Sequence, residues 1–334
     1  EGLLLATLKD PAAYLVQSIY DIQGPLDTVR LQKAWIETTQ QHAIFRTQFL
    51  LGLPDTPFPN LQLVRKHADA CWLVADWSDL DPEVAQTEYL RLEREQGFDL
   101  KQIPIRFGLF HLAPDHHRLV ISVHHAILDG WSGGLFTNAL LLNYAGRVAP
   151  PAGQVKELVA HIQAGDAAQA ERFWAAQLDG IESPSLLVDP YCVPDLTVKP
   201  SDAAYYGTLA RTLELGDQVV DFAQSYGVTV STFFRAAVAL VLHRHTGSEH
   251  PVFGTVVSGR NVAVAQVEST IGPCINTIPC RARIGRALTV GDLLQTLHHD
   301  GTAAYDYEHC RLTDIHRWSG MSPEQPLFNV LLVY

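Results

Sequence analysis

The sequence has few basic residues and no long apolar run. Its 334 residues include 24 lysines and arginines against 36 aspartates and glutamates, which gives a formal charge of -12. The basic residues are scattered, so we expect no nucleic-acid partner. Apolar stretches such as Ala236 to Leu242 fall short of the roughly 20 residues that span a bilayer, and no charged-then-apolar leader opens the chain. We therefore expect no membrane association and a cytoplasmic location.

Cysteine is scarce as well. The five cysteines lie far apart and include no C-x-x-C pair; they are Cys71, Cys192, Cys274, Cys280 and Cys310. This spacing argues against a zinc site or a redox switch, and we expect small core residues in a reducing compartment. Histidine, by contrast, is frequent, with 15 residues and several doublets. A count alone does not identify a site.

The length and the 47% apolar composition predict a large core divided between two lobes. Linker-like, proline-containing segments at 146–153 and 181–200 mark a boundary region, and we place the lobes at 1–165 and 166–334. Hydrophobic periodicity predicts strands at 14–20, 45–50, 105–111, 119–123, 208–215, 252–257, 278–284 and 328–334. It predicts helices at 27–42, 83–96, 216–226, 231–245 and 292–307. The strand-turn-helix order recurs, and the apolar runs at both ends suggest an excerpt of a longer polypeptide.

The sharpest local signal is the segment His124 to Ser132, which reads HHAILDGWS and follows a continuously apolar strand. Strand alternation sends His124 and His125 to opposite faces, so that only one lines a given cavity. A neutral imidazole is well suited to accept a proton near pH 7. Gly130 removes a side chain where a thin substrate arm would pass, and Asp129 either orients the imidazole or pairs with an arginine.

Two other interpretations of this segment exist. In the first, the histidines are hydrogen-bonded core or turn residues and Asp129-Gly130 only makes a turn. Short patterns of this kind recur by chance. A metal site is the other, and it is disfavoured because no third ligand stands at helical or hairpin spacing and the motif has no glutamate. We expect no metal.

Further segments occur in a fixed order along the chain, and together with HHAILDGWS they carry a resemblance. They are QHAIFRTQF at 41–49, FWAAQL at 173–178, SGRN at 258–261, IGPCINTIPCR at 271–281, YEH at 307–309 and LFN at 327–329, with EGLL at 1–4 as the tail of an opening motif. The set resembles the condensation domains of nonribosomal peptide synthetases, whose central motif is HHxxxDGWS. The sequences of the segments around Cys274 and Cys310 resemble those of fungal synthetases more than those of bacterial ones. Gln41 departs from the arginine usual there.

The resemblance implies an α/β fold of two lobes similar to chloramphenicol acetyltransferase, arranged as a V-shaped pseudo-dimer with a central tunnel. Upstream and downstream peptidyl carrier domains, with an adjacent adenylation domain, would deliver thioesters on 4'-phosphopantetheine arms. The domain itself would bind no cofactor. His125 would act at the midpoint, either as the base that removes the amine proton or by positioning the amine. General-base help contributes about 10²- to 10⁴-fold, and positioning at least as much.

The same resemblance assigns supporting roles. Asp129 would be structural, paired with Arg260 or, as second choice, with Arg46. His124 would be a buried supporter and Gly130 a clearance residue.

Two further residues complete the set. Trp131 would pack beside the pantetheine path. Asn276 either holds the inter-lobe segment through side-chain hydrogen bonds or is an ordinary turn residue.

Several related activities compete. Epimerisation is disfavoured because the catalytic glutamate of epimerisation domains would fall where this chain has SGRN. Heterocyclisation is disfavoured because heterocyclisation domains have aspartates where this chain has histidines. Ester formation and terminal cyclisation stay open, although His124 stands where cyclising domains often have serine. A coenzyme A-dependent acyltransferase is disfavoured because the D-F-G-W-G segment of that class is absent from this sequence. A degenerate domain that only recruits a partner is disfavoured because it would not need His125.

Overall fold

The computed structural model describes residues 2–54, 57, 59–67, 71–187, 209–212 and 214–334. The chain is mixed α/β and divides into two compact units, each described by itself. Among the described residues, the first unit contains those up to Val159 together with the segment 264–273, and the second contains the remainder from Ala160 onward. The sequence pattern gives no sign that 264–273 belongs with the first unit. The predicted division at residue 165 stays a prediction.

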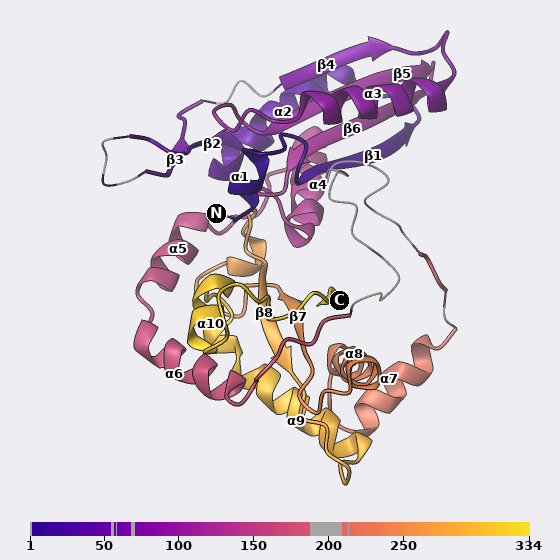
Figure 1. Cartoon of the computed structure of the whole chain (residues 1–334). Helices are drawn as coiled ribbons and strands as arrows, with labels where there is room; N and C mark the ends of the chain where they lie inside the picture. The colour runs from indigo at the N-terminus through magenta and orange to yellow at the C-terminus, as the bar shows by residue number, and fades with distance from the viewer. Residues whose placement is uncertain (1, 55–56, 58, 68–70, 188–208, 213) are drawn as a thin grey trace. The chain divides into compact units, whose positions relative to one another are not determined.

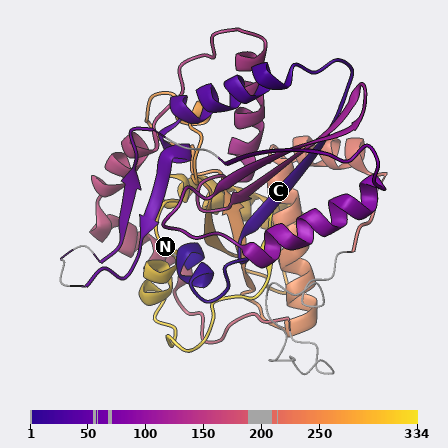
Figure 2. The ribbon, with the colours of Figure 1, turned by 90° about the horizontal axis from the view of Figure 1, so that it is seen from above.

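The first unit is built on a four-stranded sheet of order β1-β6-β5-β4, with β4 and β5 parallel and the other pairs antiparallel. Its strands are β1 (Leu15–Gln23), β4 (Cys71–Asp76), β5 (Ile105–Ala113) and β6 (His116–His124). Its helices are α1 (Gly2–Thr7), α2 (Thr28–Gln41), α3 (Pro82–Gln96), α4 (Gly130–Tyr144) and α5 (Val155–Gln163), the last reaching into the second unit. The short helix η1 (Ala43–Arg46) leads into the separate ribbon β2 (Thr47–Leu50) and β3 (Leu61–Val64), which Figure 2 shows beside the sheet.

Helices cover both faces of this sheet, as Figure 1 shows. Phe107 of β5 faces the core that α2 and α4 complete with Trp35 and Phe136. The neighbouring Phe110 faces α3 instead, as the alternation of strand side chains requires. Gly108 allows α3 to come close, because an added Cβ would lie 2.8 Å from the Tyr89 hydroxyl.

The second unit has a three-stranded sheet of order β8-β7-β9, made of β7 (Val252–Val257), β8 (Asn276–Arg281) and β9 (Leu331–Leu332). Its helices are α6 (Ala167–Leu178), α7 (Gly216–Ser225), α8 (Val230–Thr246), α9 (Val290–Ala303) and α10 (Leu312–Trp318), with short turns η3 (Val267–Ser269, in the segment of the first unit) and η4 (Tyr305–Tyr307). One core contains residues of α8 and α9, and another contains residues of α6 and α10.

Most predicted elements are confirmed, and three predicted strands differ from the structure. The strand predicted at 208–215 is absent from its described residues, where Leu209 is 77% exposed and no neighbouring strand pairs with it. The strand predicted at 328–334 shortens to Leu331–Leu332, because only these two residues pair with β7. The predicted strand 45–50 begins as the helix η1. The prediction for 181–200 lies largely outside the described residues.

Within the described residues, no single helix has the length and apolar composition needed to cross a membrane, and only the bent pair α7–α8 meets both criteria when taken together.

Candidate active site

The histidine pair lies where β6 ends. His124 is the last residue of β6 and pairs with Leu15 of β1, whereas His125 begins the turn toward α4. The His125 N–H donates to the Tyr14 carbonyl at 2.9 Å, which extends the pairing with the first strand by one bond. His124 is fully buried, and His125 is only partly buried. The two imidazoles therefore differ in their access to solvent.

The ring of His124 is held at both nitrogens. Its Nδ1 accepts a hydrogen bond from the Ala126 N–H at 3.0 Å, and its Nε2 lies 2.7 Å from the Thr7 hydroxyl. Thr7 donates to the Leu3 carbonyl at 2.9 Å, so its oxygen is free to accept from His124 Nε2–H. These bonds fit one neutral tautomer, with the proton on Nε2.

Burial, with a further effect of the His125 charge, lowers the pKa of His124 to about 4. Protonation would also place a proton on Nδ1, where the Ala126 N–H already points. His124 is therefore neutral near pH 7 and committed to Thr7 and Ala126. His125 is the member of the pair that is partly exposed to solvent.

Asp129 organises the start of α4. It is the N-cap residue, 2% exposed, and its Oδ1 accepts from the Ser132 N–H at 2.7 Å, as capping aspartates do. This bond ties the turn after His125 to the helix. The predicted ion pair with Arg260 stays a prediction.

Glycines give α4 an open side in its first turns. Cβ atoms added at Gly130, Gly133 or Gly134 would meet nothing within 4 Å. Glycine inside a helix costs about 1 kcal/mol relative to alanine, so three of them near one helix start are a costly choice for stability alone. The surface after the histidine pair is consequently free of side chains at these three positions.

Trp131 and Ser132 attach the segment 264–273 to α4. The Trp131 Nε1–H donates to the Glu268 carbonyl at 2.9 Å, and the indole is 52% exposed. The buried Ser132 hydroxyl donates to the Gly272 carbonyl at 2.9 Å and accepts from the Gly272 N–H at 3.0 Å. The resemblance implies a packing role for Trp131 and none for Ser132. The contact joins residues about 140 positions apart, and no local pattern reports it.

Arg46, the second choice as partner for Asp129, lies at the β2–β3 ribbon. Its guanidinium donates to the carbonyl of Arg65 and, at 3.5 Å, to that of Lys66. These bonds hold the chain that follows β3.

In the second unit, Asn276 holds the backbone of residues 308–310. Its side-chain amide donates to the Glu308 carbonyl at 2.7 Å and to the Cys310 carbonyl at 2.8 Å. Asn276 is the first residue of β8, not a turn residue. The buried Arg260 donates to the Ser258 carbonyl at 3.1 Å.

Gly259 and Glu308 are tightly placed in the same unit. Gly259 has a φ of 64°, and an added Cβ would lie 1.8 Å from the Cys274 carbonyl oxygen. The Glu308 side chain is fully buried and accepts a long hydrogen bond of 3.5 Å from Asn261. Burial raises the pKa of Glu308. Both residues lie within motifs of the resemblance, which implies no role for either of them.

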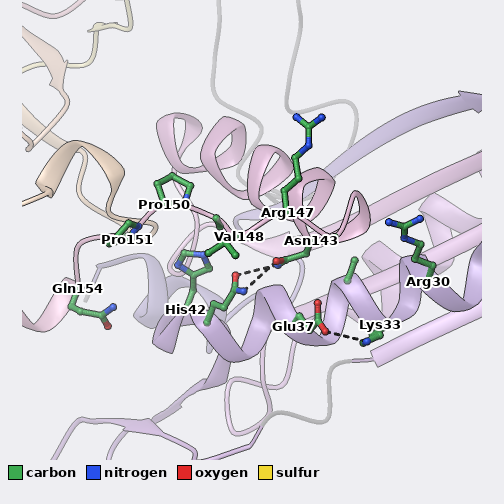
Figure 3. A pocket seen from close by; sticks show the side chains of 15 residues that line it. Arg30, Lys33, Glu37, His42, Asn143, Arg147, Val148, Pro150, Pro151 and Gln154 are labelled. Atoms are coloured by element: carbon green, nitrogen blue, oxygen red, sulfur yellow. Dashed lines mark hydrogen bonds and ion pairs between the residues drawn. The ribbon is translucent and has the colours of Figure 1, made fainter.

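A cavity of about 720 Å³ in the first unit is separate from the histidine motif (Figure 3). It is lined by α2, the end of α4 and the following loop, and none of its lining residues belongs to His124–Ser132. The amides of Gln41 and Asn143 bond to each other at 3.1 and 3.2 Å, and Glu37 pairs with Lys33 at 3.7 Å. Several polar side chains that line the cavity therefore already bond to one another.

Among the described residues, no three His, Cys, Asp or Glu side chains gather in a way that could hold a metal ion.

The chain is similar in sequence to several known proteins. The chain is 30% identical over 328 residues to chondramide synthase cmdD of Chondromyces crocatus, which covers 96% of this chain and 8% of the relative. It is 28% identical over 346 residues to bacitracin synthase 3 of Bacillus licheniformis, covering 100% and 5%. The fungal nonribosomal peptide synthetase gloA of Glarea lozoyensis is 30% identical over 314 residues, covering 93% and 4%. These three relatives are synthetases from bacteria and a fungus, and the chain spans less than a tenth of the length of each.

The family model for the condensation domain matches residues 3–334. The chain therefore belongs to the condensation domain family, and the resemblance stated from its motifs is confirmed.

Solved structures agree on the fold. The first condensation domain of the calcium-dependent antibiotic synthetase has a TM-score of 0.74 and 22% identity, covering 99% of this chain and 77% of that one. The starter condensation domain of rhizomide synthetase has a TM-score of 0.76 and 21% identity, covering 99% and 76%.

Proposed function

We propose that this chain forms an amide bond between two thioester-bound substrates, with His125 at the reacting atoms. The donor is an acyl or peptidyl thioester and the acceptor an aminoacyl thioester. Each is carried on the 4'-phosphopantetheine of a carrier domain in a cytoplasmic synthetase that also contains an adenylation domain. The observation that carries the proposal is the contrast within the histidine pair: His124 is sealed and neutral, and His125 is partly accessible at the same strand end.

The reaction needs little from the protein beyond placement and one proton acceptor. The acceptor nitrogen attacks the donor carbonyl carbon, the C–N bond forms, and the C–S bond breaks to release the donor's thiol. His125 takes the amine proton or holds the amine by a hydrogen bond until the thiolate leaves and is protonated. Either role requires a fixed imidazole, and the bond from His125 N–H to Tyr14 fixes the backbone that carries it.

The glycines of α4 support a narrow substrate arm next to this imidazole. Gly130, Gly133 and Gly134 leave open space on the helix that begins five residues after His125. A phosphopantetheine arm is thin, and close approach to backbone is a recurrent use of glycine.

The test uses the chain together with the carrier domains that flank it in its own polypeptide. Both carriers are loaded from aminoacyl-coenzyme A, and the acceptor carrier is weighed by intact-protein mass spectrometry. Amide formation adds the donor acyl mass to the acceptor, and the released product resists hydroxylamine. An unchanged acceptor mass contradicts condensation, and a hydroxylamine-labile product indicates ester formation. Released cyclic product indicates terminal cyclisation, and transfer from free acyl-coenzyme A at the same rate indicates a coenzyme A-dependent acyltransferase.

A further inference from the structure

Tyr14 has a backbone conformation that tyrosine rarely adopts. Its φ is 61°, and the Leu15 N–H donates to the Ala12 carbonyl at 3.2 Å. Tyr14 is therefore the third residue of a hydrogen-bonded four-residue turn, a position where a positive φ favours glycine or asparagine. A bulky side chain is strained in this region of backbone conformation.

Burial does not explain why tyrosine stands there. The side chain is 45% exposed, and Tyr14 belongs to no hydrophobic core cluster of the described residues. A glycine would adopt the same φ without strain.

The contacts of Tyr14 are with both histidines of the motif. Its carbonyl accepts the hydrogen bond from His125 N–H at 2.9 Å. Its ring stands edge-on to the His124 ring, with centroids 6.5 Å apart and an interplanar angle of 60°. Phe98 stands edge-on to the same imidazole, with centroids 6.2 Å apart. His124 is thus bordered by two aromatic rings, and one of them comes from the strained turn.

We propose that Tyr14 is a positioning residue for condensation: its ring keeps His124 in place and dry, and its carbonyl fixes the backbone of His125. The inference rests on the proposed function, because it assigns the effect on catalysis to His125. Glycine at this position would relieve the backbone strain and keep the carbonyl, but it would lose the ring. The ring, not the hydroxyl, carries the effect.

Two substitutions separate the ring from the backbone. Tyr14→Phe keeps the ring, and we expect its kcat for amide formation between loaded carriers to stay within about twofold of the wild type. Tyr14→Gly keeps the φ, and we expect kcat to fall at least tenfold while KM for the acceptor carrier stays within twofold and Tm does not fall. Tyr20→Ala is the matched control, since Tyr20 is also partly exposed, at 37%, on the strand that follows; its kcat should not change.

Wild-type kcat in Tyr14→Gly would overturn the inference, as would a loss of kcat that follows a falling Tm. Should the glycine variant fail to fold, Tyr14→Asn replaces it, because asparagine also tolerates a positive φ.

A spectroscopic measurement tests the contact without relying on activity. In protein labelled with ¹³C and ¹⁵N at histidine, Tyr14→Gly should move the titration of the His124 ring upward from its low midpoint, and Tyr14→Phe should not. An unmoved titration in the glycine variant contradicts the inference. If the titration moves but His125→Ala still condenses, the contact is right and the role proposed for His125 is wrong. If His125→Ala is inactive and Tyr14→Gly changes neither readout, this inference alone fails.

Discussion

The buried His124 should make the chain less stable in acid. An ordinary histidine titrates at 6.5, and burial lowers the pKa of His124 to about 4. Between these two pKa values, the histidine binds a proton in the unfolded chain and does not bind one in the folded chain. The stabilisation is therefore complete above pH 6.5 and is lost as the pH falls toward 4. A difference of about 2.5 units, at 1.36 kcal/mol per unit, corresponds to about 3 kcal/mol.

His124→Asn isolates this contribution. Asparagine does not titrate, and its side-chain oxygen can accept the Ala126 N–H in place of Nδ1. Urea unfolding of both proteins from pH 7.5 to pH 4 gives the difference in their free energies of unfolding. Burial also lowers the pKa values of His42 and His309, but these residues are present in both proteins and cancel.

We expect the wild type's advantage over His124→Asn to shrink by about 3 kcal/mol between pH 7.5 and pH 4. An advantage that stays constant across this range would refute the reasoning. So would a His124 ring that titrates near 6.5 in the folded wild type.

Substitutions at four further positions test other parts of the two units. Ser132→Ala leaves the N–H and C=O of Gly272 without their partner and should cost about 2–4 kcal/mol in urea unfolding; a change below about 0.5 kcal/mol contradicts this. Asp129→Ala removes the cap of α4 and should lower the unfolding free energy by at least about 1 kcal/mol, whereas Asp129→Asn, which keeps an acceptor, should lose less. Gly259→Ala should reduce Tm sharply or prevent folding, because its Cβ would collide with the Cys274 carbonyl; a wild-type Tm would show that the strand ends can separate. Glu308→Gln should raise Tm at pH 8 more than at pH 5, because a buried carboxyl with a raised pKa loses stability as the pH rises; an equal effect at both pH values contradicts this.

Local patterns predicted the elements whose causes are local. Asp27 predicts the start of α2, and its side chain accepts from the Arg30 N–H at 2.9 Å. The apolar run at 119–123 predicts β6, which is buried along nearly its whole length. The position of the histidine pair could also be predicted, because the pair lies at the end of that strand.

Contacts distant in sequence were beyond the same reasoning. Alternation around Leu209 predicts a strand, but a strand also needs a partner, and the described residues there have none. The bond between Thr7 and His124 joins residues 117 positions apart. The positive φ of Tyr14 could not be predicted from the sequence either, because tyrosine is an unusual residue at such a turn position.

Whether His125 acts on the reacting atoms can be measured in a single-turnover experiment. Donor and acceptor carriers are loaded beforehand and mixed with excess wild type, His125→Ala or His116→Ala, a matched control at the other end of β6. We expect His125→Ala to slow amide formation at least about 10²-fold at an unchanged Tm, and His116→Ala to react at the wild-type rate. A folded His125→Ala protein that condenses as fast as the wild type would contradict it.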